Sequence, residues 1–211
     1  MKDIINTLLE NYIVVIIAIV ALILYLCRNK IKGKLGEMKA SNTLNELDRS
    51  EYKVLDNLIL YSDNKTHEID NVVISKYGIF VVEMKNYQGK VVGDKDSDKW
   101  TQYIGKRVNK FYNPVKQNYG HMRCLSDVLK IDMRYLIPVV VFSNDTYIES
   151  DVKYVIKLNY VNKYIMKFKK NMYIDVDDVY KKLKKLNITD KSIKKKHVDS
   201  VKKRKWYIWQ L

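Results

Sequence analysis

The sequence contains little cysteine, proline and glycine. Its 211 residues include only two cysteines, Cys27 and Cys124, which excludes a disulfide framework and a four-thiolate zinc site and fits a reducing compartment. Two prolines and seven glycines leave little material for a long flexible linker. A Gly-rich phosphate loop and a Gly-x-Ser-x-Gly turn are both missing, so nucleotide hydrolysis and acyl transfer lose support. The length fits one ordinary domain with a single core.

Charge is missing from one stretch near the N-terminus. Residues 11–27 carry no charged side chain and are rich in Ile, Val and Leu. A helix of that length spans roughly 26 Å, slightly less than a hydrocarbon core of about 30 Å. We therefore predict a transmembrane helix that contacts the membrane through residues 12–27. A cleaved signal peptide is the alternative, but no small-x-small cleavage site follows the apolar run.

The charges that flank this stretch predict its orientation. Four cations follow it directly, namely Arg28, Lys30, Lys32 and Lys34, whereas Lys2, Asp3 and Glu10 precede it. The positive-inside rule then predicts a single-pass protein of the cell membrane with its C-terminal domain in the cytoplasm.

Acidic residues are outnumbered, and the net charge is +15. The excess lies at the two ends, in residues 28–40 and 181–205, while residues 41–180 are nearly balanced. Anionic lipid explains the first basic segment, whereas the second indicates either another lipid contact or a nucleic-acid backbone. A solvated lysine-rich helix is a third explanation.

Hydrophobic periodicity predicts a domain of the α/β or α+β class after the transmembrane helix. Expected helices cover 32–47, 114–130, 175–186 and 190–203, and expected strands cover 52–60, 68–75, 79–85, 90–92, 136–142 and, less clearly, 152–157. The apolar face of the first helix should contain Leu35, Met38, Leu44 and Leu47, and that of the second Val115, Tyr119, Met122 and Leu125 or Leu129.

A hairpin around Tyr77-Gly78 brings three charges into an apolar pair of strands. If Lys76 pairs with Ile79, Asp70 lies opposite Lys85 and diagonal to Glu83. Glu83 and Lys85 share a strand face because they are two residues apart. Charges in such a setting cost several kcal/mol unless they are paired or bound to a metal.

The residue types in this cluster suit phosphodiester hydrolysis. Two neighbouring carboxylates offer oxygen ligands for Mg²⁺ or Mn²⁺, and an ammonium group can hold or activate a water for attack on phosphorus. An internal salt bridge between Lys85 and one of the carboxylates is the structural alternative.

A wider set of residues resembles the nuclease-related domain, the NERD family. The matching stretches, in order, are Gly36-Glu37, His67 to Val73, Gly78 to Asn86, Gly89, Gly93, Trp100 and Asn113-Pro114-Val115-Lys116-Gln117-Asn118. The resemblance covers about residues 33–145. Met84 departs from the small residue that is common there, and its side chain should point away from the site.

The resemblance implies a restriction-endonuclease-like α/β fold of the PD-(D/E)xK superfamily, a mixed α+β sheet flanked by helices. It also implies metal-dependent nuclease activity. It implies that Asp70 and Glu83 bind the metal, that Lys85 serves the attacking water, that Glu37 supports the metal and that Gln117 lines the site. The expected organisation is a transmembrane anchor at 1–28, a nuclease-like domain at 29–145 and a basic C-terminal extension at 146–211 that packs on the same domain.

Other motifs were considered as sites. Asp94-x-Asp96-x-Asp98 lacks the Gly and the Glu of a calcium loop and is interpreted as a polar turn. His67, His121 and His197 lack metal-ligand spacing, although His121 is one helical turn from Gln117. Trp206, Tyr207 and Trp209 follow a basic run and fit either an interfacial anchor or a terminal segment packed on the domain.

Two functions follow from the sequence. In the first, the protein is a membrane-anchored, Mg²⁺-dependent nuclease that hydrolyses nucleic acid, with DNA as the expected substrate, at the cytoplasmic face. In the second, the same fold is catalytically silent and binds nucleic acid or protein at the membrane, with residues 181–205 as the main contact.

Overall fold

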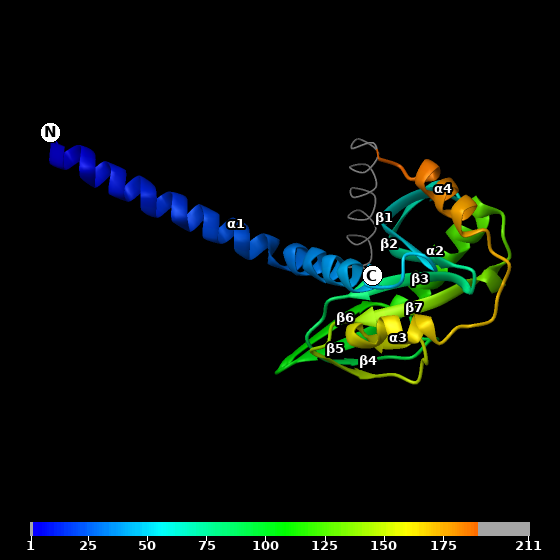
Figure 1. The fold of residues 1–211 in the computed structure, drawn as a ribbon. Helices are drawn as coiled ribbons and strands as arrows, with labels where there is room; N and C mark the ends of the chain where they lie inside the picture. The colour runs from blue at the N-terminus through cyan, green and yellow to red at the C-terminus, as the bar shows by residue number, and fades with distance from the viewer. Residues whose placement is uncertain (1, 190–211) are drawn as a thin grey trace.

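A computed structural model describes residues 2–189 of the chain, with side chains from Tyr12 onward (Figure 1). The helices are α1 Lys2–Leu44, α2 Pro114–Leu129, α3 Val161–Met166 and α4 Val176–Leu186, with 3-10 turns at Met133–Tyr135 and Leu158–Tyr160. The strands are β1 Tyr52–Ser62, β2 Lys65–Ser75, β3 Gly78–Lys85, β4 Gly89–Val92, β5 Lys99–Ile104, β6 Arg107–Tyr112, β7 Leu136–Phe142, β8 Thr146–Glu149 and β9 Val155–Lys157. The helix expected at 190–203 and the aromatic tail lie outside the described residues.

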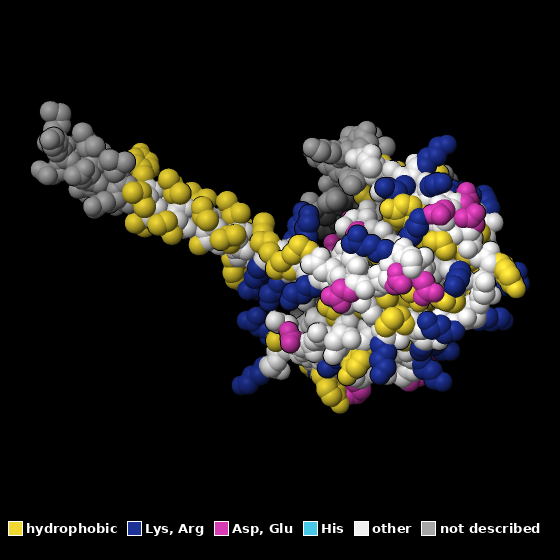
Figure 2. Space-filling model, in the orientation of Figure 1, with side chains coloured by type: hydrophobic (Ala, Val, Ile, Leu, Met, Phe, Trp, Pro, Cys, Tyr) yellow, Lys and Arg dark blue, Asp and Glu magenta, His cyan; other side chains and the backbone are white. Residues whose placement is uncertain are grey.

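The two expected N-terminal helices form one continuous helix, α1, which extends away from the domain (Figure 1). Hydrophobic side chains cover it from Tyr12 to Leu26, and all of them are exposed (Figure 2). This part of α1 is long and apolar enough to cross a membrane, and none of it is buried in the protein. An apolar helix with no protein partner is unfavourable in water, so it calls for a lipid environment or an apolar partner.

The end of α1 packs on the domain through a face that agrees with the expected one at Leu44 and at Leu47, just after the helix, but not nearer the N-terminus. Ala40, Leu44 and Leu47 are buried as part of the core, and Gly36 is buried beside them. The prediction was wrong for Leu35 and Met38, which are 43% and 53% exposed. The small residues Gly36 and Ala40 let the helix backbone approach the sheet closely, which turns the larger side chains outward.

The main sheet has the order β1-β2-β3-β7-β9, with β1, β2 and β3 antiparallel and β7 and β9 parallel to β3. One face packs on α1 and α3 through a core that includes Phe80 and Ile165. The other face packs on α2 and α4 through a core that includes Leu125 and Leu183. The expected mixed α+β class is confirmed as a sheet between two helical layers.

The register expected for the β2–β3 hairpin was wrong by one residue in each strand. Ser75 pairs with Gly78, so the two-residue turn is Lys76-Tyr77. The Ser75 hydroxyl accepts a hydrogen bond from the Tyr77 amide and donates one to the Gly78 carbonyl, which stabilises this turn. Gly78 has φ of 150°, and a Cβ there would lie 2.4 Å from Cδ1 of Ile137. This position therefore excludes a larger residue.

Helix α2 begins at a buried cap and crosses the main sheet. The Asn113 side chain accepts a hydrogen bond from the Val115 amide, and Pro114 occupies the first turn. Tyr119 was expected in the core but is 56% exposed. Asn118 is buried instead, because its amide donates to the carbonyls of Val81 and Val139 and so ties the helix to β3 and β7.

A second sheet, which the sequence analysis predicted only through β4, has the order β6-β5-β4-β8. Trp100 of β5 is fully buried and stacks on Phe142 of β7, with ring centroids 6.0 Å apart and an interplanar angle of 7°. Tyr87 and Phe111 complete this aromatic contact. The second sheet is therefore anchored at the C-terminal end of β7.

We expect Gly36→Ala to lower the free energy of unfolding by about 1–3 kcal/mol, because the added Cβ would lie 2.5 Å from Cβ of Asn86. Gly33→Ala is the matched control, since nothing lies within 4 Å of its added Cβ and alanine has the higher helix propensity. Urea unfolding of the full chain in detergent, followed by near-UV circular dichroism, measures both. Equal midpoints for the two variants would contradict close packing at Gly36.

Candidate active site

Charged side chains gather at the C-terminal end of β3, which is otherwise apolar. Glu83 is 1% exposed, and its Oε1 accepts a hydrogen bond of 2.5 Å from Nζ of Lys85. The Lys85 ammonium also donates to Oε1 of Gln117, at 3.1 Å. Two hydrogen bonds from one ammonium group therefore join two predicted site residues on β3 and one on α2.

Asp70 reaches the same place from β2 through an irregularity in the sheet. The β1–β2 ladder skips the pair Asn57 and Asp70, and Asn57 has φ of 52°. The β2–β3 ladder stops at Asn71, so the expected pairing of Asp70 with Lys85 was wrong. Oδ2 of Asp70 accepts a hydrogen bond of 2.8 Å from the Met84 amide instead. The carboxylate of Asp70 is thereby held across the end of β3.

Burial and neighbouring charges set the pKa values of these groups. Desolvation and the charge of Glu83 raise the pKa of Asp70 well above its usual range, against the effects of Lys85 and the Met84 amide. Desolvation also acts to raise the pKa of Glu83, but Lys85 and His121 outweigh it and hold that pKa below its usual value. Burial opposes a charge on Lys85, yet Glu83 and Asp70 raise the pKa of its ammonium. The pair on β3 is therefore ionised at neutral pH.

Glu37 lies beside this cluster on α1. Its pKa is raised by burial and by the charges of Glu68 and Glu83. Asn86, the residue after Lys85, donates a hydrogen bond of 2.6 Å to the Lys32 carbonyl of α1. This contact and the close approach at Gly36 place Glu37 at the end of β3. The structure thus brings together all five residues selected from the sequence, Glu37, Asp70, Glu83, Lys85 and Gln117.

His121 is a buried neighbour that the sequence analysis left out of the site. Its Nε2 lies 3.1 Å from Oε2 of Glu83, and apart from this contact Oε2 and both ring nitrogens are buried without a hydrogen-bonding partner. The ring also contacts His67 edge to face, with centroids 6.3 Å apart. The spacing of Gln117 and His121, one helical turn apart, was the signal that could have identified it.

Met84 points away from the cluster, as predicted. Its side chain is buried in the core beneath α1 and α3, on the opposite face of the sheet from Glu83 and Lys85.

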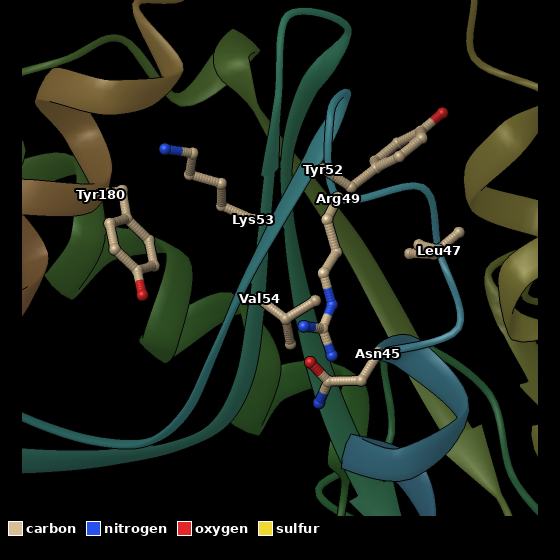
Figure 3. Close-up of a pocket in the computed structure, with 7 residues that line it drawn as sticks. All are labelled: Asn45, Leu47, Arg49, Tyr52, Lys53, Val54 and Tyr180. Carbon is tan, nitrogen blue, oxygen red and sulfur yellow. The ribbon is translucent and has the colours of Figure 1, made fainter.

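Two hollows lie near α1. One, of about 470 Å³, is bordered by Glu37 together with apolar residues of α1 and the Asp56-Asn57 corner of β1. The other, of about 350 Å³, lies between β1, α4 and the segment after α1 (Figure 3). Its two cations are Arg49, whose guanidinium points toward Asn45, and Lys53, which pairs with Asp177 (Figure 3). Of the five site residues, Glu37 alone borders the first hollow, and none borders the second.

Comparison with known proteins identifies the family of this chain. The family model of the nuclease-related domain matches residues 32–143, which include every residue of the cluster. The chain belongs to the nuclease-related domain family. An uncharacterized protein of Bacillus anthracis is 34% identical over 177 residues, which cover 80% of this chain and 83% of that protein. No solved structure matches the chain.

The raised pKa of Asp70 predicts how stability depends on pH. The folded protein binds this proton more tightly than the unfolded chain, whose carboxyl has a pKa near 3.8. The contribution of Asp70 to the free energy of unfolding therefore falls progressively as the pH rises from about 4 toward its folded pKa. Asp70→Asn should unfold at the same urea concentration as the native protein below that window and at a higher one near neutral pH.

Asp151→Asn, which changes an exposed carboxylate, is the control and should follow the native protein at every pH. Urea unfolding at a series of pH values measures the three proteins. A native-like curve for Asp70→Asn across the series would contradict the buried position of this carboxyl group.

Proposed function

We propose that this protein is a metal-dependent nuclease that α1 holds at the cytoplasmic face of a membrane. The observation that carries the proposal is the buried cluster of Asp70, Glu83 and Lys85 at the end of an apolar strand, with Gln117 bonded to the lysine. A salt bridge that served only stability would not need Asp70 and Glu37 beside it, because both carboxyl groups have raised pKa values there. Desolvating them costs free energy, as is typical of functional sites.

The donor set fits a hard divalent cation. No group of three or more His, Cys, Asp or Glu within the described part of the chain is arranged to hold a metal, which disfavours a closed cage of the zinc type. Mg²⁺ needs fewer protein ligands, since one or two carboxylates suffice when substrate phosphates and water complete its coordination shell. Asp70 and Glu83 would be these ligands, and Oε2 of Glu83 is a buried oxygen without a hydrogen-bonding partner. Mg²⁺ or Mn²⁺ would supply charge neutralisation at the phosphate that is attacked.

The side chains of the cluster have distinct tasks in phosphodiester hydrolysis. Lys85 is charged, so its ammonium donates hydrogen bonds and orients a water molecule rather than removing its proton. Gln117 fixes the ammonium by accepting one of its hydrogen bonds. Asp70 must lose its proton before it can act as a ligand, so activity should rise with pH through its raised pKa. Glu37 adds negative charge on the open side of the site.

Cleavage by the full chain in detergent should require Mg²⁺ or Mn²⁺ and stop with a chelator, whether the substrate is linear, circular or single-stranded. Glu83→Gln and Lys85→Ala should each reduce the rate by at least about 100-fold. Glu51→Gln and Lys76→Ala are the matched controls, because they form a partly exposed Lys–Glu pair, 3.5 Å apart, at the other end of the sheet. They should leave the rate unchanged.

Two outcomes would contradict this proposal, one in favour of a catalytic site elsewhere and one in favour of a silent binding module. Metal-dependent cleavage that survives in both Glu83→Gln and Lys85→Ala would remove this cluster as the site. Nucleic-acid binding by the native chain without cleavage under any metal condition would favour the silent binding module.

The anchoring role of α1 has its own test. The full chain should stay with the membrane fraction in alkaline carbonate, and a reporter fused to its C-terminus should be cytoplasmic. Val20→Arg places a charge in the middle of the apolar stretch at a cost of about 2.5–3.5 kcal/mol and should release a measurable fraction. Asn42→Arg, on the same helix beyond that stretch, is the control. Release of the native chain by carbonate would contradict the anchor.

A further inference from the structure

The outer face of the second sheet presents an unusual row of side chains. Cross-strand pairing places Val108 of β6, Tyr103 of β5, Lys90 of β4 and Tyr147 of β8 side by side across all four strands. Tyr103 is 42% exposed and Tyr147 is 64% exposed, although both lie in regular strands. Neighbouring strands are about 4.8 Å apart, so the two rings lie roughly 10 Å from each other and neither covers the other.

Cations surround these tyrosines. Residues 99–112, which form β5, β6 and their turn, contain Lys99, Lys106, Arg107 and Lys110 and no acidic residue. Within the part of the chain that the structure describes, none of these four cations forms an ion pair. Glu149 also lies on the outer face, where it pairs with Lys90 at 2.5 Å. By strand alternation Lys90, Lys99 and Lys110 share the outer face with the tyrosines, whereas Arg107, which pairs with Ile104, lies on the inner face. Three lysines against Glu149 leave the outer face positive, which suits a polyanion.

The inner face of the same sheet is linked to the end of β3, where the cluster of Asp70, Glu83 and Lys85 lies. Trp100, on the inner side of β5, stacks on Phe142, and Phe142 pairs with Lys85 in the parallel β3–β7 register. The Tyr87 carbonyl, two residues after Lys85, accepts hydrogen bonds from the hydroxyls of Ser143 and Thr146 at the start of β8. The second sheet is therefore fixed relative to the end of β3.

We propose that the outer face of the four-stranded sheet binds single-stranded nucleic acid, with Tyr103 and Tyr147 stacking on bases and Lys99 and Lys110 contacting phosphates. This proposal rests on the proposed nuclease function, because binding at this face would deliver a single-stranded substrate to the cluster. Exposed aromatic rings beside cations on a sheet surface are a combination that binds single strands, because every base offers a face for stacking. A duplex hides its base faces, so the tyrosines would add little to duplex binding.

Fluorescence anisotropy of a labelled oligothymidine, with the full chain in neutral phosphatidylcholine nanodiscs and a chelator present, measures binding without cleavage. The double variant Tyr103→Thr/Tyr147→Thr should bind at least about 10-fold more weakly. Threonine is chosen because it retains a high β propensity. Tyr103→Phe/Tyr147→Phe keeps both rings and should bind like the native chain. Tyr160→Thr removes a tyrosine that is 54% exposed outside this sheet and should have no effect.

The lysines are tested through the salt dependence. Lys110→Gln should make the slope of log affinity against log salt shallower by about 0.7 for a single strand. Lys170→Gln, at an exposed lysine outside both sheets, should leave the slope unchanged.

Unchanged affinity in the double threonine variant would overturn the proposal, as would equal weakening in the phenylalanine variant. So would a native chain that binds the duplex and the single strand equally well, with both affinities insensitive to the tyrosines. Binding to phosphatidylserine vesicles that depends on Tyr103 and Tyr147, without binding of the oligonucleotide, would assign the face to lipid and also overturn it.

The test of oligonucleotide binding and the test of cleavage can fail independently of each other. Glu83→Gln should bind the oligonucleotide normally, since it lies outside the outer face. Tyrosine-dependent binding without cleavage would contradict the nuclease function alone, and cleavage of single strands that does not depend on the tyrosines would contradict this surface alone.

Discussion

The carboxylate of Glu83 lies almost without solvent at the end of a strand made of Ile, Phe, Val and Met, and the surrounding structure neutralises it. An isolated buried charge would cost several kcal/mol, so the ammonium of Lys85 and the imidazole of His121 lie against its two oxygens. Gln117 and His121 both come from α2, which Asn118 ties to β3 and β7. The position of α2 is thus coupled to the charge of a single residue.

One uninterrupted helix, α1, contains both the exposed apolar stretch and Glu37. Its exposed apolar stretch ends near Leu26, and Glu37 follows about three helical turns later on the same uninterrupted helix. If the apolar stretch lies in a bilayer, the acidic cluster lies within about 20 Å of the lipid. The close approach at Gly36 and the bond from Asn86 to the Lys32 carbonyl make α1 part of the site rather than a flexible tether.

The second sheet, β6-β5-β4-β8, is attached next to the end of β3, where the charged cluster lies. Its inner face is an aromatic contact that leads from Trp100 through Phe142 to Lys85, and its outer face is exposed, basic and aromatic. The second sheet thereby combines a rigid attachment with an exposed surface, an arrangement that suits the positioning of a long polymer beside the proposed catalytic cluster.

The sequence by itself determined the apolar N-terminal helix, the long strands of the main sheet, helix α2 and the identity of the charged residues, because these depend on local periodicity and on charges in apolar runs. Only the tertiary structure decided the register of the β2–β3 hairpin, where the Ser75 hydroxyl favours the Lys76-Tyr77 turn, and the route by which Asp70 reaches Met84. It also decided the buried face of α1, which Gly36 sets by contact with a residue fifty positions away. The short strands β5, β6 and β8 depend on pairing, β5 with β4 and β6 and β8 with β4, and on the burial of Trp100, so no local pattern identified them.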